Sequence, residues 1–175
     1  ENLVGEENKG WTCAKYLLSY ERTNIAGVGS SMAAYERLKE VARTTRRGAA
    51  ALIEDPLFAA RMAEIEIDLE NMRTTNLRVL DSVGRGQTPM AESSMLKIRG
   101  TEIRQKITAL MRRAAGRYAQ PFMEEALEGG FNGEPVGPDW AAPVASQYFN
   151  NRKLSIFGGS NEVQREIIGK SMMGL

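Results

Sequence analysis

One long stretch decides the fold of this chain: residues 55–86, which read DPLFAARMAEIEIDLENMRTTNLRVLDSVGRG. Asp55 can cap a helix, Pro56 suits its first position, and Gly84-Arg85-Gly86 ends it. Between these signals one set of residues, apolar except for a single asparagine, recurs at steps of three and four, which places it on one helix face. The set is Phe58, Met62, Ile65, Leu69, Met72, Asn76, Val79 and Val83. The stretch therefore predicts a long helix with one buried face.

Similar patterns predict helices on both sides of this stretch. We expect them over about residues 9–46, 89–120, 139–153 and 160–173, with a loop, or a short helix and a loop, at 121–138. In the helix at 89–120 the inward residues are Leu96, Ile103, Ile107, Leu110 and Ala114. No stretch alternates as a strand does, so the expected fold class is all-α, an antiparallel four-helix-type bundle over residues 9–175.

In the first predicted helix a carboxylate interrupts an apolar face. That face comprises Trp11, Ala14, Leu18, Glu21, Ile25, Val28, Met32 and Tyr35. Because an unpaired buried charge is strongly unfavourable, Glu21 either faces a partner charge or lines a cavity. Spacing alone leaves open a register change at a kink, an ion pair with an arginine of a neighbouring helix, and a functional pocket. Gly27 and Gly29 should weaken this helix by about 1 kcal/mol each relative to alanine, which close approach of another backbone or a ligand would offset.

Composition narrows the classes of function. The chain has 175 residues, 42 % hydrophobic and 26 % charged, and its net charge of +1 gives no field that would recruit nucleic acid or a membrane surface. No apolar run reaches the roughly 18 residues of a membrane span. The single cysteine, Cys13, cannot form an internal disulfide and fits the cytoplasm. Without histidine there is neither a His-based triad nor a Cys/His metal site, so chemistry here needs carboxylates or a cofactor.

A second informative stretch, residues 155–165, reads SIFGGSNEVQR. Its two glycines allow the backbone to approach a flat group, and the helix that follows presents free N–H groups at the same place. Asn161 and Gln164 have the spacing of a capping box. The pattern alone fits either a ligand site or a simple turn and helix cap.

This tail resembles the C-terminal signature of acyl-CoA dehydrogenases, in which an aromatic residue, a Gly-Thr/Ser pair and Asn/Gln-Glu/Ile-x-Gln-Arg lead into the last helix. Residues 3–11, LVGEENKGW, are similar to the family's passage from a β-domain into its C-terminal helical domain. Residues 18–27, LSYERTNIAG, are similar to the first helix of that domain. We therefore expect residues 1–8 to be a linker from a β-domain, and the start without Met to reflect a piece of a longer protein.

The resemblance implies a reaction. Members of the family bind FAD and convert acyl-CoA thioesters to trans-2-enoyl-CoA, with a carboxylate taking the α-proton, the flavin taking the β-hydride and an electron-transfer protein as acceptor. Most members carry the glutamate at the position of Gly158, where this chain has no base. A minority carry it directly before an arginine on the first C-terminal helix, which matches Glu21-Arg22. The resemblance thus implies Glu21 as catalytic base, substrate contacts from Ser19, Tyr20 and Arg22, and FAD contacts from Phe157, Gly158, Gly159, Ser160 and Glu162.

Two motifs of the family are missing. Relatives carry Arg-x-x-Phe-Gly after the first helix, which binds FAD across a subunit interface, whereas residues 43–49 here read RTTRRGA. Nothing in residues 121–150 matches the family's Gln-x-x-Gly-Gly motif. We expect a homo- or hetero-oligomer, and the gaps favour a heteromeric enzyme whose partner supplies the absent contacts. The alternative is a non-catalytic assembly module that lines only part of a cofactor cavity. In either case these residues alone should not turn over substrate.

Overall fold

The computed structural model describes residues 2–88 and 91–174, except for the side chains of residues 19, 20, 22 and 23. These described residues contain six α-helices: α1 (Gly10–Ala26), α2 (Val28–Thr44), α3 (Pro56–Gly84), α4 (Ala91–Ala115), α5 (Val144–Asn150) and α6 (Asn161–Ile168). A small antiparallel hairpin pairs β1 (Arg46–Arg47) with β2 (Ala50–Ala51). Short 3₁₀ turns lie at Leu52–Glu54, Gly116–Ala119, Glu125–Leu127 and Asn151–Ser155, and a π turn at Gly169–Met173. The predicted all-α, four-helix-type fold is confirmed.

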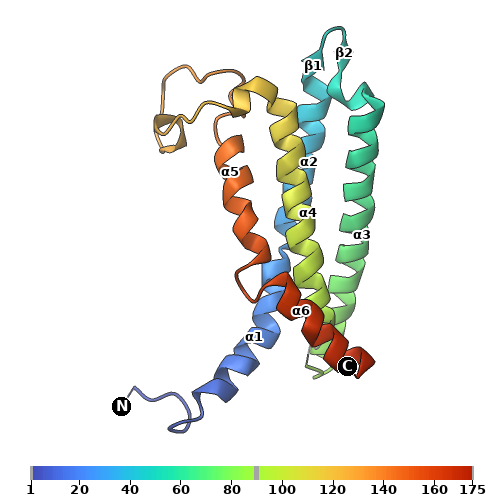
Figure 1. Ribbon diagram of the computed structural model, residues 1–175, viewed down its shortest axis with the longest axis vertical. Helices are drawn as coiled ribbons and strands as arrows, with labels where there is room; N and C mark the ends of the chain where they lie inside the picture. Colours follow the sequence, from blue (N-terminus) through green and yellow to red (C-terminus); the bar gives the residue numbers. More distant parts are fainter. Residues whose placement is uncertain (1, 89–90, 175) are drawn as a thin grey trace. The chain divides into compact units, whose positions relative to one another are not determined.

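The chain forms two compact units. We call residues 1–28, 70–101 and 154–175 the tail unit, and residues 29–69 and 102–153 the bundle unit. In the bundle unit α2, the first part of α3, the last part of α4 and α5 run alongside one another (Figure 1). Its larger buried apolar side chains are Tyr35, Leu38, Val41, Leu52, Phe58, Met62, Ile65, Leu69, Ile103, Ile107, Leu110 and Val144. Most of them come from the periodic faces that the sequence predicts for α3 and α4.

Local signals explain where α3 begins and how α2 is attached to it. Asp55 Oδ1 accepts 2.9 Å hydrogen bonds from the backbone N–H groups of Leu57 and Phe58, so the predicted N-cap is confirmed. On α2 the hydroxyl of Tyr35 donates a 2.9 Å hydrogen bond to the carbonyl oxygen of Met62. This bond satisfies a polar group inside an otherwise apolar contact.

In the tail unit two helices touch through their backbones. Gly100 of α4 lies against Ala26 of α1: a Cβ atom on Gly100 would overlap the Ala26 carbonyl oxygen and lie 2.7 Å from its Cα. Ala26 and Gly100 are both buried. The described residues contain no helix that is both long enough and apolar enough to span a membrane.

The prediction of one continuous helix over residues 9–46 is wrong. Gly27 adopts the left-handed conformation, with φ 58°, and its N–H donates a 3.0 Å hydrogen bond to the carbonyl of Asn24, so it ends α1. The predicted face is not buried along α1, where Trp11 is 69 % exposed, whereas Tyr35 on α2 is 3 % exposed. Glu21 is exposed as well. The predicted helix at 139–153 is also shorter: α5 begins only at Val144, and a 3₁₀ turn follows it from Asn151.

Candidate functional site

The first part of the candidate site is the outer face of α1. Glu21 lies in the last part of this helix with its side chain exposed. Ile25, one turn further along the same face, is half-buried. Ser19, Tyr20 and Arg22 also belong to α1, but their side chains are outside the described residues.

The second part is the turn that precedes α6. Phe157 exposes 43 % of its surface, and Gly158 and Gly159 follow with φ angles of 68° and 83°. Both glycines occupy the left-handed region that disfavours other residues. A Cβ atom on Gly158 would overlap Cδ1 of Ile25, and one on Gly159 would overlap Nε2 of Gln164. The glycines thus serve close packing of this turn against α1 and α6.

The start of α6 differs from the predicted capping box. Ser160, not Asn161, is the N-cap: its hydroxyl oxygen accepts a 3.4 Å hydrogen bond from the backbone N–H of Val163. Asn161 is turned inward and is 6 % exposed. Sequence spacing misassigned the cap because serine and asparagine are both strong N-cap residues and stand side by side here.

Glu162 lies in the first turn of α6 and is exposed. Hydrogen bonds from its own backbone N–H and from the Ser160 hydroxyl hold the pKa of its carboxyl group below the ordinary value of 4.5. Arg165, 3.6 Å away, and Lys97 add attraction in the same direction. The carboxylate is therefore negatively charged at neutral pH beside the turn.

The two parts of the candidate site, α1 and the turn before α6, lie next to each other in the tail unit. The turn at Gly158 meets α1 at Ile25, and Glu21 is one helical turn away on the same face of α1. This region therefore contains an exposed carboxylate, an exposed aromatic ring, a hydroxyl group and a helix N-terminus. Such a set can accept a proton and offer both an apolar face and hydrogen-bond donors to a flat ring system.

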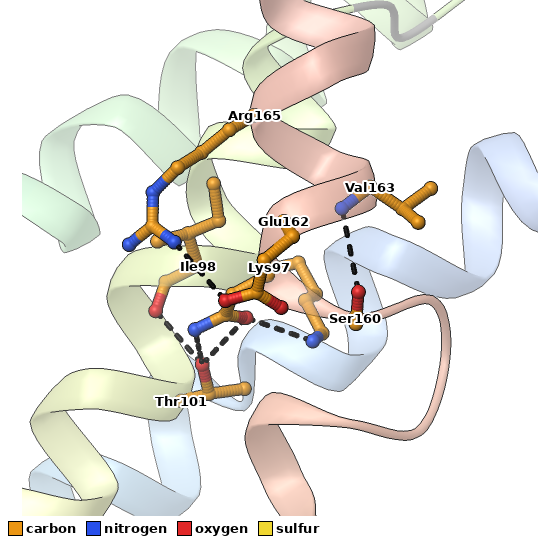
Figure 2. Close-up of polar contacts among 8 residues, drawn as sticks. Lys97, Ile98, Thr101, Ser160, Glu162, Val163 and Arg165 are labelled. Carbon is orange, nitrogen blue, oxygen red and sulfur yellow. Dashed lines mark hydrogen bonds and ion pairs between the residues drawn. The ribbon is translucent and has the colours of Figure 1, made fainter.

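A buried polar cluster, which was not predicted from the sequence, lies behind this region. Lys97, Thr101, Asn161 and Gln164 are all nearly or fully buried, and hydrogen bonds join the first three. Figure 2 shows Lys97 and Thr101 of α4 beside the start of α6. The sequence did contain an indication of this cluster. Lys97 and Thr101 are four residues apart, and they lie among the apolar inward positions of α4.

Comparison with known proteins assigns the family. The sequence model of the protein family "Acyl-CoA dehydrogenase, C-terminal domain" matches residues 8–173 of this chain. Acyl-CoA dehydrogenase FadE26 of Mycobacterium tuberculosis is 26 % identical over 99 % of this chain and 42 % of its own length. Butyryl-CoA dehydrogenase from Megasphaera elsdenii superposes with a TM-score of 0.77 at 19 % identity, over 98 % of this chain and 41 % of its own. The FAD complex of PigA gives the same TM-score and identity, over 97 % and 40 %.

This chain belongs to the family of acyl-CoA dehydrogenase C-terminal domains. The resemblance that the two ends of the sequence indicate is confirmed. The chain spans about two fifths of the length of the proteins that it matches, with 42 % of FadE26 and 41 % of the butyryl-CoA dehydrogenase covered.

The segment that lacks the family's arginine motif lies in the bundle unit. Arg43 is in the last turn of α2, and Arg46 and Arg47 form β1. Arg46 Nη1 donates a 2.7 Å hydrogen bond to the Ala49 carbonyl, and Arg47 Nη2 donates one of 2.9 Å to the carbonyl of Arg113. Both guanidinium groups thus bind backbone carbonyls of their own unit.

Proposed function

We propose that the complete protein is an FAD-dependent acyl-CoA dehydrogenase and that Glu21 is its catalytic base. In this proposal the carboxylate of Glu21 takes the α-proton of an acyl-CoA thioester while a double bond forms between the α- and β-carbons. FAD, when bound, supplies the acceptor for the β-hydride. A separate electron-transfer protein would then accept the electrons. Membership in the family supports the reaction class.

The observation that carries the choice of Glu21 is the contact between Gly158 and Ile25. The family resemblance offers two positions for the base, residue 158 and residue 21. In the tail unit the backbone at 158 lies against Ile25, one turn from Glu21. A carboxylate at either position would therefore lie in the same region of the tail unit. In this chain only residue 21 has a carboxylate.

The residues of the turn fit FAD in their chemistry. The isoalloxazine ring needs an apolar surface for its face and hydrogen-bond donors for the oxygen and nitrogen atoms on its edge. Phe157 offers an exposed aromatic ring, and Ser160 offers a hydroxyl group at the N-terminus of α6. Gly158 and Gly159 let the turn between them pack closely against Ile25 and Gln164. We propose that these residues and Glu162 contact the flavin, and that Ser19, Tyr20 and Arg22 line the thioester pocket.

A thioester α-proton is weakly acidic, so its base must lie within hydrogen-bond reach and away from water. Glu21 is exposed in this chain. In the complete enzyme we propose that the acyl-CoA and the remaining domains cover this face of α1. A carboxylate that is shielded from water is a stronger base than one in solution.

A second candidate is a non-catalytic module that assembles with an active partner subunit. The departure at residues 43–49 supports it, because Arg46 and Arg47 bind carbonyl groups of the bundle unit. The exposed carboxylate of Glu21 beside the tail turn favours the catalytic proposal. In both candidate functions a partner subunit completes the cofactor site.

Replacement of Glu21 in the full-length protein separates the two candidates. Glu21→Gln keeps the shape of the side chain but cannot take a proton, so we expect dehydrogenation to fall by roughly 10²–10⁴-fold with FAD still bound. The measurement is turnover of acyl-CoA thioesters with an artificial electron acceptor. Glu64→Gln, at an exposed carboxylate of α3, is the matched control and should leave turnover unchanged. A Glu21→Gln enzyme with near-normal turnover would remove this residue from catalysis.

A further inference from the structure

A buried lysine lies behind the start of α6 in the tail unit. The side chain of Lys97 (Figure 2) is 0 % exposed, and its Nζ donates a 2.9 Å hydrogen bond to Oδ1 of Asn161. Burial lowers the pKa of Lys97 below the ordinary value of 10.5, and attraction to the Glu162 carboxylate acts against this shift. Because an ammonium group is unfavourable to bury, apolar packing alone does not explain a lysine at this position.

Thr101 contacts the same amide from one turn further along α4. Its hydroxyl donates a 2.9 Å hydrogen bond to the carbonyl of Ile98 and lies 3.3 Å from Oδ1 and 3.4 Å from Nδ2 of Asn161. An ammonium group can only donate, so the atom that faces Lys97 must be the amide oxygen. Lys97 therefore fixes which way the Asn161 amide points, with both of its polar atoms beside the Thr101 hydroxyl.

A second buried amide holds the turn from the side of α6. Gln164 is 0 % exposed, and its Nε2 donates a 3.3 Å hydrogen bond to the carbonyl of Gly158. These two contacts hold the segment 157–162 at Gly158 and at Asn161. The same segment carries the exposed ring of Phe157 and the hydroxyl of Ser160. The location of those groups thus depends on Asn161 and Gln164, and that of Asn161 on Lys97.

We propose that Lys97 is a positioning residue: through Asn161 it holds the backbone of residues 157–162 in the conformation that receives FAD. This inference rests on the proposed function, because it takes that segment to contact the flavin. Lys97 itself does not touch the ligand. A methionine at position 97 would fill a similar volume, but it could not donate a hydrogen bond to the Asn161 oxygen. The orientation of the Asn161 amide would then no longer be fixed by a charged donor.

The test compares Lys97→Met with Lys106→Met in the full-length protein. Lys106 is on the same helix, but it is 46 % exposed and forms a 2.7 Å surface ion pair with Asp68. We expect Lys97→Met to raise the dissociation constant of FAD from the apoenzyme by about tenfold or more. In the FAD-free enzyme we expect amide hydrogen exchange in segment 157–164 to become about tenfold faster or more. Lys106→Met should change neither quantity.

A purely structural role of Lys97 predicts a different result. A lower melting temperature with unchanged FAD affinity, flavin spectrum and amide exchange in segment 157–164 would overturn the inference. If Lys97→Met does not fold, Asn161→Ala removes the same contact from the other side. That variant should show the same two changes, and normal values for it would equally overturn the inference.

The outcome for the unchanged protein separates the inference from the proposed function. A wild-type protein that binds FAD, with a Lys97→Met variant that binds it equally well, defeats only the role of Lys97. A wild-type protein that binds no FAD, alone or with its partner subunit, defeats the proposed function and this inference with it. A Glu21→Gln enzyme that keeps its activity defeats the catalytic assignment and leaves the role of Lys97 in FAD binding intact.

Discussion

Burial changes the ionisation of single side chains in both units. In the bundle unit, burial first, and then the charge and hydrogen bond of Glu66, raise the pKa of Tyr35 to about 12. In the tail unit, burial lowers the pKa of Lys97. The two shifts have the same physical cause, because loss of water disfavours a phenolate and an ammonium group alike.

The shift of Tyr35 predicts a loss of stability at high pH. Its pKa in the folded chain, about 12, lies above the ordinary value of 10.0. The folded chain therefore keeps a proton that the unfolded chain releases, and this contribution is complete below pH 10 and lost as the pH rises through about 12. The free energy of unfolding in urea, measured across this range, should fall less steeply for Tyr35→Phe.

Tyr16→Phe is the control for this experiment, because Tyr16 is 67 % exposed. It should leave the steep decline of the unmodified chain in place. An equal decline in Tyr35→Phe and the unmodified chain would show that Tyr35 does not carry the effect.

At the level of single residues, the sequence did not predict which side chains are covered. A carboxylate that breaks an apolar stripe drew attention to Glu21, yet that side chain is exposed. The stripe contains no information about which parts of α1 other segments cover. Lys97 escaped attention because a charged residue on a helix is normally at the surface, and only the contact with Asn161 explains its burial.

At the scale of elements, periodicity predicted α3 and α4 because their buried faces extend over many turns. The boundary between α1 and α2 was missed because a glycine within a helical pattern can either continue the helix or end it. The predicted close approach of a backbone exists, but at Gly100 on α4, where it meets the C-terminal end of α1. Gly29 was the other candidate for such a close approach. A Cβ atom on Gly29 would lie in open space, with no other group within 4 Å.

This contrast between two glycines predicts opposite effects of the same substitution. Gly100→Ala forces a methyl group into the backbone of Ala26, so we expect a loss of about 1–3 kcal/mol in the free energy of unfolding. Gly29→Ala adds a methyl group in open space within α2 and should be neutral or stabilising by up to about 1 kcal/mol. Urea unfolding of both variants gives the comparison. Similar values for the two would show that α1 and α4 do not touch at Gly100.

At the scale of the whole molecule, the departures from family motifs predict dependence on a partner. The chain lacks the arginine motif, and its own Arg46 and Arg47 bind carbonyl groups of the bundle unit. We therefore expect the full-length protein to purify with little FAD when expressed alone, and with FAD and activity when co-expressed with the product of a neighbouring gene. The flavin-to-protein ratio of each preparation measures this. Full FAD content and activity in the protein expressed alone would contradict a heteromeric assembly.

The role of Glu21 as catalytic base is tested most directly by a single turnover of the complete enzyme. Full-length protein with bound FAD is mixed with acyl-CoA in the absence of an electron acceptor, and the loss of oxidised-flavin absorbance is followed for the wild type and for Glu21→Gln. If Glu21 removes the α-proton, flavin reduction in the variant should slow by roughly 10²–10⁴-fold while FAD remains bound. Reduction of the variant flavin at the wild-type rate would show that Glu21 is not the base.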